Sequence, residues 1–349
     1  MARRTNGDGA ILSQRVLNRT LLRRQLLLER AAITLPDAVE QVGALQTQYA
    51  PSGYVGLWTR VAEFHRDDLT RALEDRSVIQ ATLMRTTIHV TSRRDFWKLA
   101  MGTQRSQREW AERTQALPPE RKLRTTADAL RAALADGPKT VKELGDVAKG
   151  FVGSLGYWVP LVRVPPSGTW ERRRADRLAL AEDWVGPIDA TEDEGLEHLV
   201  RTYLRAFGPA PWKDIAQWAG VAVVDLRRGA ANLTLVRYRD EKRGELVDLA
   251  ELEVIDEGAT APVRFLPHWD ANLLVHARRT QLLPEAFRPK VFSIKNPFSV
   301  GVYLVDGQAA GAWSVRGGRI VLDEFVALRP GDRKAVERER EALEAFHGP

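Results

Sequence analysis

The stretch "SVIQATLMRTTIHVTS", residues 77–92, does most to decide the expected fold of this chain. Its β-branched residues predict two short strands. Apolar residues at three- and four-residue spacing predict helices before it, over residues 11–30, 36–45, 53–64 and 67–73. Helices followed by a β-hairpin are the order of a winged helix, in which the two strands form the wing.

A similar order recurs twice along the chain. Residues 127–150 predict two helices around a Gly-Pro turn, and residues 151–173 are expected to supply a third helix and a wing. Residues 197–221 again predict helix, turn and helix, and residues 222–240 predict a third helix that runs into a strand. The second helix of such a unit can enter a DNA groove. Ordinary helical hairpins packed in a core, or units that contact only proteins, fit the same pattern.

The chain becomes β-rich from about residue 261. Alternating apolar and polar residues flank two turn signals, Asp306-Gly307 and the run from Arg316 to Gly318, and a charged helix is expected over 332–346. The sequence therefore predicts an α+β fold, mainly helical, with three tandem winged helix-turn-helix units. Their boundaries are expected at 1–115, 116–190 and 191–258, before a β-hairpin-rich region with a terminal helix at 259–349.

Composition narrows the function classes. The chain has 349 residues, 44% hydrophobic and 28% charged, which is typical of a soluble globular protein with two or more domains. It has no cysteine, which excludes disulfides, thiolate metal sites and a cysteine nucleophile. Its 52 Lys and Arg against 46 Asp and Glu permit nucleic-acid binding without proving it. No apolar stretch indicates export or a membrane span, so a cytoplasmic location is expected.

Most familiar catalytic patterns are missing from the sequence. The six histidines show no metal-binding spacing, and there is no phosphate-cradling glycine loop, so neither a metal nor a cofactor is expected. The glycine and serine around Ser154 miss the nucleophile-elbow spacing. Asp270 stands out because it follows Trp269 in an apolar stretch, where a charge needs a partner. Arg278 and Arg279 are the candidate partners, and such a pair would make Asp270 structural.

Two glutamines, Gln46 and Gln48, lie in the stretch "GALQTQYAPSGYVGLW", residues 43–58. Ala50 precedes Pro51, and a residue before proline is biased toward extended backbone. The chain from Gln46 to Ala50 is therefore expected to be extended, which points residues two apart to the same side. Both amides would then face one place, although polar residues at a helix end can simply meet water.

Four stretches, in this order, resemble signatures of the AlkZ/YcaQ-type winged-helix DNA glycosylases. Residues 43–60 resemble the family's Gln-x-Gln or Gln-x-Asp motif, and residues 83–97 resemble its Arg-x-Thr-x-His strand, with Thr86 where a glycine-like residue is usual. Residues 266–284 are similar to its Trp-Asp-Asn-Leu-Leu segment, with Ala271 inserted, and residues 302–313 match its Val-Asp-Gly hairpin. The resemblance spans most of the chain.

This resemblance implies a C-shaped arrangement of the three units and hydrolysis of the N-glycosidic bond of alkylated purines in double-stranded DNA. In some members the substrates include interstrand crosslinks through guanine N7. The resemblance implies that Gln46 and Gln48 are the catalytic pair, and assigns supporting or site-lining roles to His89, Trp269 and Asp270. The protein is expected to be a monomer. Charge and position predict phosphate contacts for five arginines: Arg85, Arg93, Arg94, Arg227 and Arg228.

Amide side chains limit the bases that can leave. A neutral amide can position water but is a poor general base, so it suits a purine that already carries positive charge and departs neutral. Gln rather than Asp at position 48 favours bulky N7-guanine adducts, as in self-resistance enzymes. No lysine stands out as a Schiff-base nucleophile, so an uncleaved abasic strand is the expected product. A non-catalytic winged-helix transcription regulator is the main alternative, because fold does not settle function, and a protein-interaction scaffold is the second.

Overall fold

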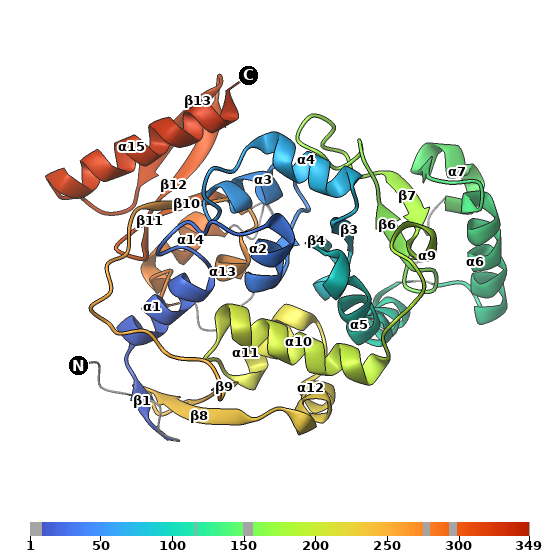
Figure 1. Ribbon diagram of the computed structural model, residues 1–349, viewed down its shortest axis with the longest axis horizontal. Helices are drawn as coiled ribbons and strands as arrows, with labels where there is room; N and C mark the ends of the chain where they lie inside the picture. Colours follow the sequence, from blue (N-terminus) through green and yellow to red (C-terminus); the bar gives the residue numbers. More distant parts are fainter. Residues whose placement is uncertain (1–8, 116, 149–155, 275–279, 293–298, 349) are drawn as a thin grey trace.

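The computed structural model describes residues 9–115, 117–148, 156–274, 280–292 and 299–348 (Figure 1). Helices and strands are both abundant in these ranges, so the expected α+β class is confirmed. The C-terminal sheet and helix lie at one end of the molecule, and the helices α6 (Glu120–Leu134) and α7 (Val141–Ala148) lie at the other (Figure 1).

The first segment surrounds the predicted hairpin with helices. The hairpin consists of β3 (Val78–Thr82) and β4 (Ile88–Ser92), joined by the 3₁₀ turn η1 (Met84–Thr86), which confirms the two strands expected over 77–92. The helices of this segment are α1 (Gln14–Arg24), α2 (Leu35–Gln41), α3 (Pro51–Trp58), α4 (Arg66–Glu74) and α5 (Arg93–Thr114). The sequence patterns did not predict α5.

The helix expected over 11–30 is shorter than predicted. Residues Ile11–Leu12 form strand β1, which pairs in parallel with a strand far along the chain. Ser13 caps α1 by accepting a hydrogen bond from the backbone N–H of Val16. The helix ends at Arg24, and Leu26 just beyond it has a left-handed φ of 56°. Strand pairing and capping therefore override the apolar spacing.

The second segment contributes helices and a hairpin of its own. Its elements are α6 (Glu120–Leu134), β5 (Lys139–Thr140), α7 (Val141–Ala148), β6 (Leu161–Arg163), β7 (Arg177–Leu180) and α9 (Ala181–Trp184). The wing expected within 151–173 is partly wrong, because its second strand, β7, begins at Arg177; residues 151–155 lie outside the described ranges. Because β6 pairs with β3, both hairpins join one six-stranded sheet, ordered β2-β4-β3-β6-β7-β5 with β2 at Leu45–Gln46.

The third segment packs its first helix against α5. Its elements follow the expected order: α10 (Glu192–Phe207), α11 (Trp212–Ala219), α12 (Val223–Gly229), η2 (Ala230–Asn232), β8 (Leu235–Asp240) and β9 (Glu245–Leu249). Helices α5 and α10 meet at Gly102 and Gly195, where a Cβ on Gly102 would lie 2.6 Å from the backbone of Gly195. Only glycine permits so close a contact, which fixes the third segment against the first.

The C-terminal region forms a four-stranded antiparallel sheet. Its elements are β10 (Arg264–Leu266), α13 (Ala271–Leu274), η3 (Glu285–Phe287), α14 (Arg288–Val291), β11 (Gly301–Val305), β12 (Gln308–Arg316), β13 (Arg319–Glu324) and α15 (Pro330–His347). Both predicted hairpins are confirmed. The two turn residues have positive φ in each, Asp306-Gly307 and Gly317-Gly318, as two-residue hairpin turns require.

Candidate active site

Gln46 lies on β2, a two-residue strand at the edge of the six-stranded sheet. Strand β2 is antiparallel to β4, and Gln46 lies directly opposite His89. Directly opposite side chains share one face of a sheet, so Gln46 and His89 are neighbours. Gln46 is buried, with 8% of its surface exposed. The structure therefore brings the 43–60 and 83–97 motifs together.

Arg85 holds the amide of Gln46. Its Nη2 donates to Gln46 Oε1 at 2.6 Å, and its Nη1 donates to the carbonyl oxygen of Trp218, near the end of α11, at 2.5 Å. A guanidinium only donates, so the Gln46 atom that it contacts must be the oxygen, and the Nε2 donors point elsewhere. Burial lowers the pKa of Arg85 to about 10, which leaves it charged at neutral pH.

The turn that carries Arg85 has an unfavourable backbone. Arg85 and Thr86 have left-handed φ angles of 53° and 59°. Each such residue costs about 1 to 3 kcal/mol and persists only where its surroundings fix it. Gly220, which caps α11, lies so close that a Cβ there would be 3.0 Å from the Arg85 backbone nitrogen. The end of α11 thus holds the turn, and the turn holds Gln46.

Gln48 contacts the same hairpin from its exposed side. Its Oε1 accepts a hydrogen bond from the backbone N–H of Ile88 at 3.1 Å. Extended pairing continues to Thr47, but the chain bends at Gln48, and Ala50 is helical with φ −49° and ψ −45°. The expectation of extended chain as far as Ala50 is therefore wrong. Ala50 is buried at the start of α3, and this packing offsets the bias that Pro51 imposes.

His89 is a buried, neutral side chain. Its Nδ1 lies 3.0 Å from the carbonyl oxygen of Thr87, so this nitrogen carries the proton and donates. Burial, together with the charge of Arg85, lowers the pKa of His89 to about 3. At neutral pH His89 is therefore a neutral imidazole, which is too weak an acid to serve as a general acid.

Asp270 belongs to a buried polar network. Its Oδ2 accepts from Arg60 Nη2 at 2.8 Å, and both side chains are only 2% exposed. Its Oδ1 accepts from Asn272, whose Nδ2 also donates to Gln25 Oε1. Both carboxylate oxygens are engaged, so the carboxylate holds the fold. No sequence signal pointed to Arg60 or Gln25; the candidate partners at 278 and 279 lie outside the described residues.

Trp269 connects this network to the glutamine motif. Gln46, Trp269 and Asp270 line one cavity of about 10 Å³, roughly the room that a single water molecule needs. The preceding His268 packs edge-on against Tyr49, with ring centroids 5.9 Å apart. The 266–284 motif therefore meets the 43–60 motif in space.

Two of the arginines expected to contact phosphate are held by carboxylates. Arg94 binds Asp37 and Glu40, and Arg228 binds Glu192 at 2.9 Å. A phosphate would have to compete with these pairs for the guanidinium, and the phosphate contacts of both residues stay predictions.

Arg93 and Arg227, two more of the five arginines, lack such a pairing in the described part of the chain. Arg93 donates to the carbonyl oxygen of Val185, and Arg227 lies 5.5 Å from the ring centre of Trp212. Both side chains are exposed, so their predicted phosphate contacts are sterically open.

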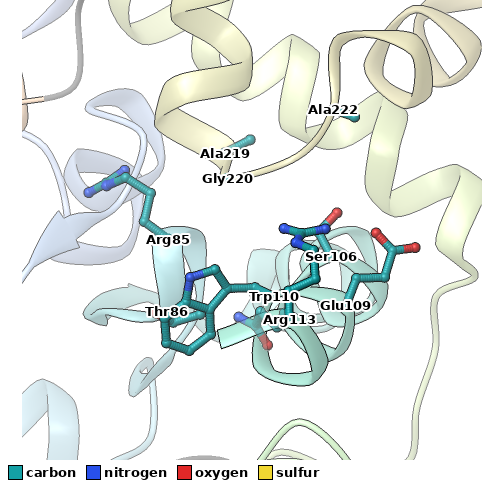
Figure 2. A pocket seen from close by; sticks show the side chains of 10 residues that line it. Arg85, Thr86, Ser106, Glu109, Trp110, Arg113, Ala219, Gly220 and Ala222 are labelled. Atoms are coloured by element: carbon teal, nitrogen blue, oxygen red, sulfur yellow. The ribbon is translucent and has the colours of Figure 1, made fainter. Parts of the chain in front are cut away.

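A larger cavity of about 430 Å³ adjoins Arg85. Side chains from one face of α5 line it on one side, and the turn after α11 lines it on the other, with Arg85 at one end (Figure 2). The cavity therefore opens beside the guanidinium that holds Gln46.

No metal centre accompanies this site among the residues that the structure describes, where no group of three or more His, Asp or Glu side chains could hold an ion. Within the same ranges, no helix combines the length and apolar character that a membrane span requires.

Comparisons with known proteins bear on the fold and the family of the chain. The chain is similar in fold to the Streptomyces sahachiroi DNA glycosylase AlkZ, with a TM-score of 0.81 and 18% identity over 97% of each chain. The comparison with curated proteins gives no match. Residues 39–346 match the model of the AlkZ-like DNA glycosylases, and this span includes both glutamines, the Arg85 turn and Asp270. The chain therefore belongs to the AlkZ-like DNA glycosylase family and is a DNA glycosylase.

Proposed function

We propose that this DNA glycosylase removes cationic alkylated purines from double-stranded DNA, with Gln46 and Gln48 as its catalytic pair. One observation carries the proposal: both amide oxygens bind the β3-β4 hairpin, Gln46 through Arg85 in the turn and Gln48 through the backbone of Ile88 at the start of β4. These contacts leave each amide its N–H donors and a further lone pair, with which it can orient a water or a sugar.

The neighbouring ionisable groups support a cationic substrate. His89 is neutral at physiological pH, and both oxygens of Asp270 are engaged by other side chains. A site without an available acid suits a base that leaves neutral, such as N7-alkylguanine or N3-alkyladenine. Gln48 in place of aspartate supports bulky N7-guanine adducts, including interstrand crosslinks, as the narrower substrate class.

We infer that the framework consists of three winged-helix units in a C-shaped arrangement, bounded at 1–115, 116–190 and 191–258. Helices followed by hairpins β3-β4, β6-β7 and β8-β9 support this division. The β3-β6 pairing joins the first two units through one sheet.

Base release from a duplex that contains N7-methylguanine tests the proposed activity. Wild type should produce abasic sites without strand cleavage, and Gln46→Ala and Gln48→Ala should each be about 100-fold slower or worse, as for a lost transition-state donor. Gln41→Ala is the matched control, because the Gln41 amide on α2 donates to the Arg24 carbonyl oxygen on α1, away from the β3-β4 hairpin.

Three results would contradict the proposal. They are no release by wild type from any cationic lesion, a bell-shaped rate profile around neutral pH, and trapping of a covalent DNA adduct by borohydride. Family membership does not favour a non-catalytic regulator; tight sequence-selective binding without base release would restore that alternative.

A further inference from the structure

The 430 Å³ cavity beside Arg85 has no part in the reaction described above. Its volume lies within the range of roughly 300 to 1,000 Å³ that is usual for small-molecule sites, and it can hold one nucleotide. It lies between α5 and the turn after α11, next to the guanidinium that positions Gln46 (Figure 2).

An aromatic side chain forms one wall of this cavity. Ser106, Trp110 and Arg113 project from successive turns of α5, at the three- and four-residue spacing that places side chains on one helix face. Trp110 is 37% exposed, which is unusual for so large an apolar side chain. An exposed indole in a hollow offers a flat surface on which a nucleobase can stack.

The charges of the cavity favour an anion. Within the described residues, neither Arg85 nor Arg113 has a carboxylate within ion-pair distance, and both line the cavity. The acidic lining residue is Glu109, which lies 3.9 Å from Arg105. Arg85 uses two of its five N–H donors on Gln46 and Trp218, so three remain for a ligand. Two guanidiniums attract a phosphate group and repel a second cation.

We propose that this cavity binds a nucleotide with an uncharged base, displaced from the duplex, with its base stacked on Trp110 and its phosphate between Arg113 and Arg85. The identification of the nucleotide rests on the proposed function, because Arg113 would repel the cationic base of an N7-alkylguanine. The occupant is therefore a neighbour of the damaged nucleotide rather than the damaged base itself. Removing a neighbour from the stack exposes the glycosidic bond of the lesion to Gln46 and Gln48.

A lesion-free duplex with one unpaired 2-aminopurine tests this cavity directly, because stacking on an aromatic ring quenches its fluorescence. Wild type should quench the probe, Trp110→Phe should still do so, and Trp110→Ala should lose the quenching and bind about tenfold more weakly. Arg113→Gln should lower the slope of log affinity against log salt by about 1, whereas Arg113→Lys should preserve it. Thermal unfolding confirms that each variant is folded.

The failure of this inference is separable from failure of the proposed function. Base release from an N7-methylguanine duplex is measured with the same wild-type preparation. If wild type releases the damaged base but the quenching does not depend on Trp110, the cavity assignment is refuted and the proposed function is not. Quenching that depends on Trp110, without release from any cationic lesion, supports the nucleotide site and refutes the proposed substrate class.

Discussion

Replacing Arg85 with lysine tests whether the turn positions Gln46 or serves only to bind DNA. The guanidinium joins two partners through two nitrogens, Gln46 Oε1 at 2.6 Å and the Trp218 carbonyl oxygen at 2.5 Å. An ammonium keeps the charge but lacks this rigid fork, so it cannot hold both partners in the same geometry. Lysine and arginine share the left-handed backbone cost at φ 53°, so that cost cancels in the comparison.

The size of the effect follows from the bond that is lost. A hydrogen bond to a charged group contributes about 1.5 to 3 kcal/mol. If this energy serves to hold Gln46 in its reacting position, Arg85→Lys should release base about 10- to 100-fold more slowly, because 1.36 kcal/mol is tenfold in rate.

Single-turnover base release at saturating enzyme measures this step without the influence of binding. If Arg85 positions Gln46, Arg85→Lys should lower the saturated rate of base release and leave the salt dependence of DNA binding unchanged. If Arg85 serves only as a phosphate contact, Arg85→Ala should lower the slope of log affinity against log salt and leave the saturated rate unchanged. Arg93→Lys is the matched control, because the Arg93 guanidinium donates to the Val185 carbonyl oxygen and is not bonded to Gln46. A saturated rate for Arg85→Lys that equals the control would refute the positioning role.

Acidification should destabilise the protein through His89, whose pKa falls from 6.5 to about 3 on folding. Between these two pH values the unfolded state binds more protons than the folded state. The contribution of His89 to the free energy of unfolding is therefore complete above about pH 6.5 and falls by about 2 kcal/mol between pH 7 and pH 5. Urea unfolding at both values checks it, and an equal loss in His89→Phe would contradict it. Asp270→Ala should cost about 3 to 5 kcal/mol in the same assay, because Arg60 would remain charged and buried; a cost below about 1 kcal/mol would show that the network relaxes. Gly220→Ala should lower both the free energy of unfolding and the rate of base release, because a Cβ at φ +71° is unfavourable and would press on the Arg85 backbone. An unchanged rate of base release would show that the end of α11 does not influence the site.

Local patterns were enough to predict most helices and every hairpin whose turn has a strong chemical signature. Asp306-Gly307 and Gly317-Gly318 could be recognised because few residues accept two consecutive positive φ angles. The six-stranded sheet could not be predicted, because the β3-β6 pairing joins Gln80 to Arg163, and tertiary packing rather than local sequence sets such pairs. The same limit applies to β1, a two-residue strand that resembled the start of a helix.

Some residues of the candidate site could likewise be predicted from the sequence, and others could not. The resemblance of two stretches, 43–60 and 266–284, predicted that Gln46, Trp269 and Asp270 belong to one site, and these residues line one cavity. The role of Arg85 could not be predicted, because an arginine that holds an amide and one that binds phosphate look alike in sequence. Its geometry depends on the Trp218 carbonyl oxygen, which only the folded chain brings within 2.5 Å.

The order of synthesis determines when this site is complete. Gln46 leaves the ribosome early, but strand β3 pairs with β6 only later, and the Arg85 guanidinium contacts Trp218 later still. The small cavity that Gln46 and Trp269 line is complete only after Asp270 has been made. Contacts between residues so far apart along the chain form late, because closing long loops costs entropy. A nascent chain that stops before α11 carries both glutamines but lacks the Trp218 carbonyl oxygen that anchors the Arg85 guanidinium, so the contacts that hold Gln46 are completed only after α11 has been made.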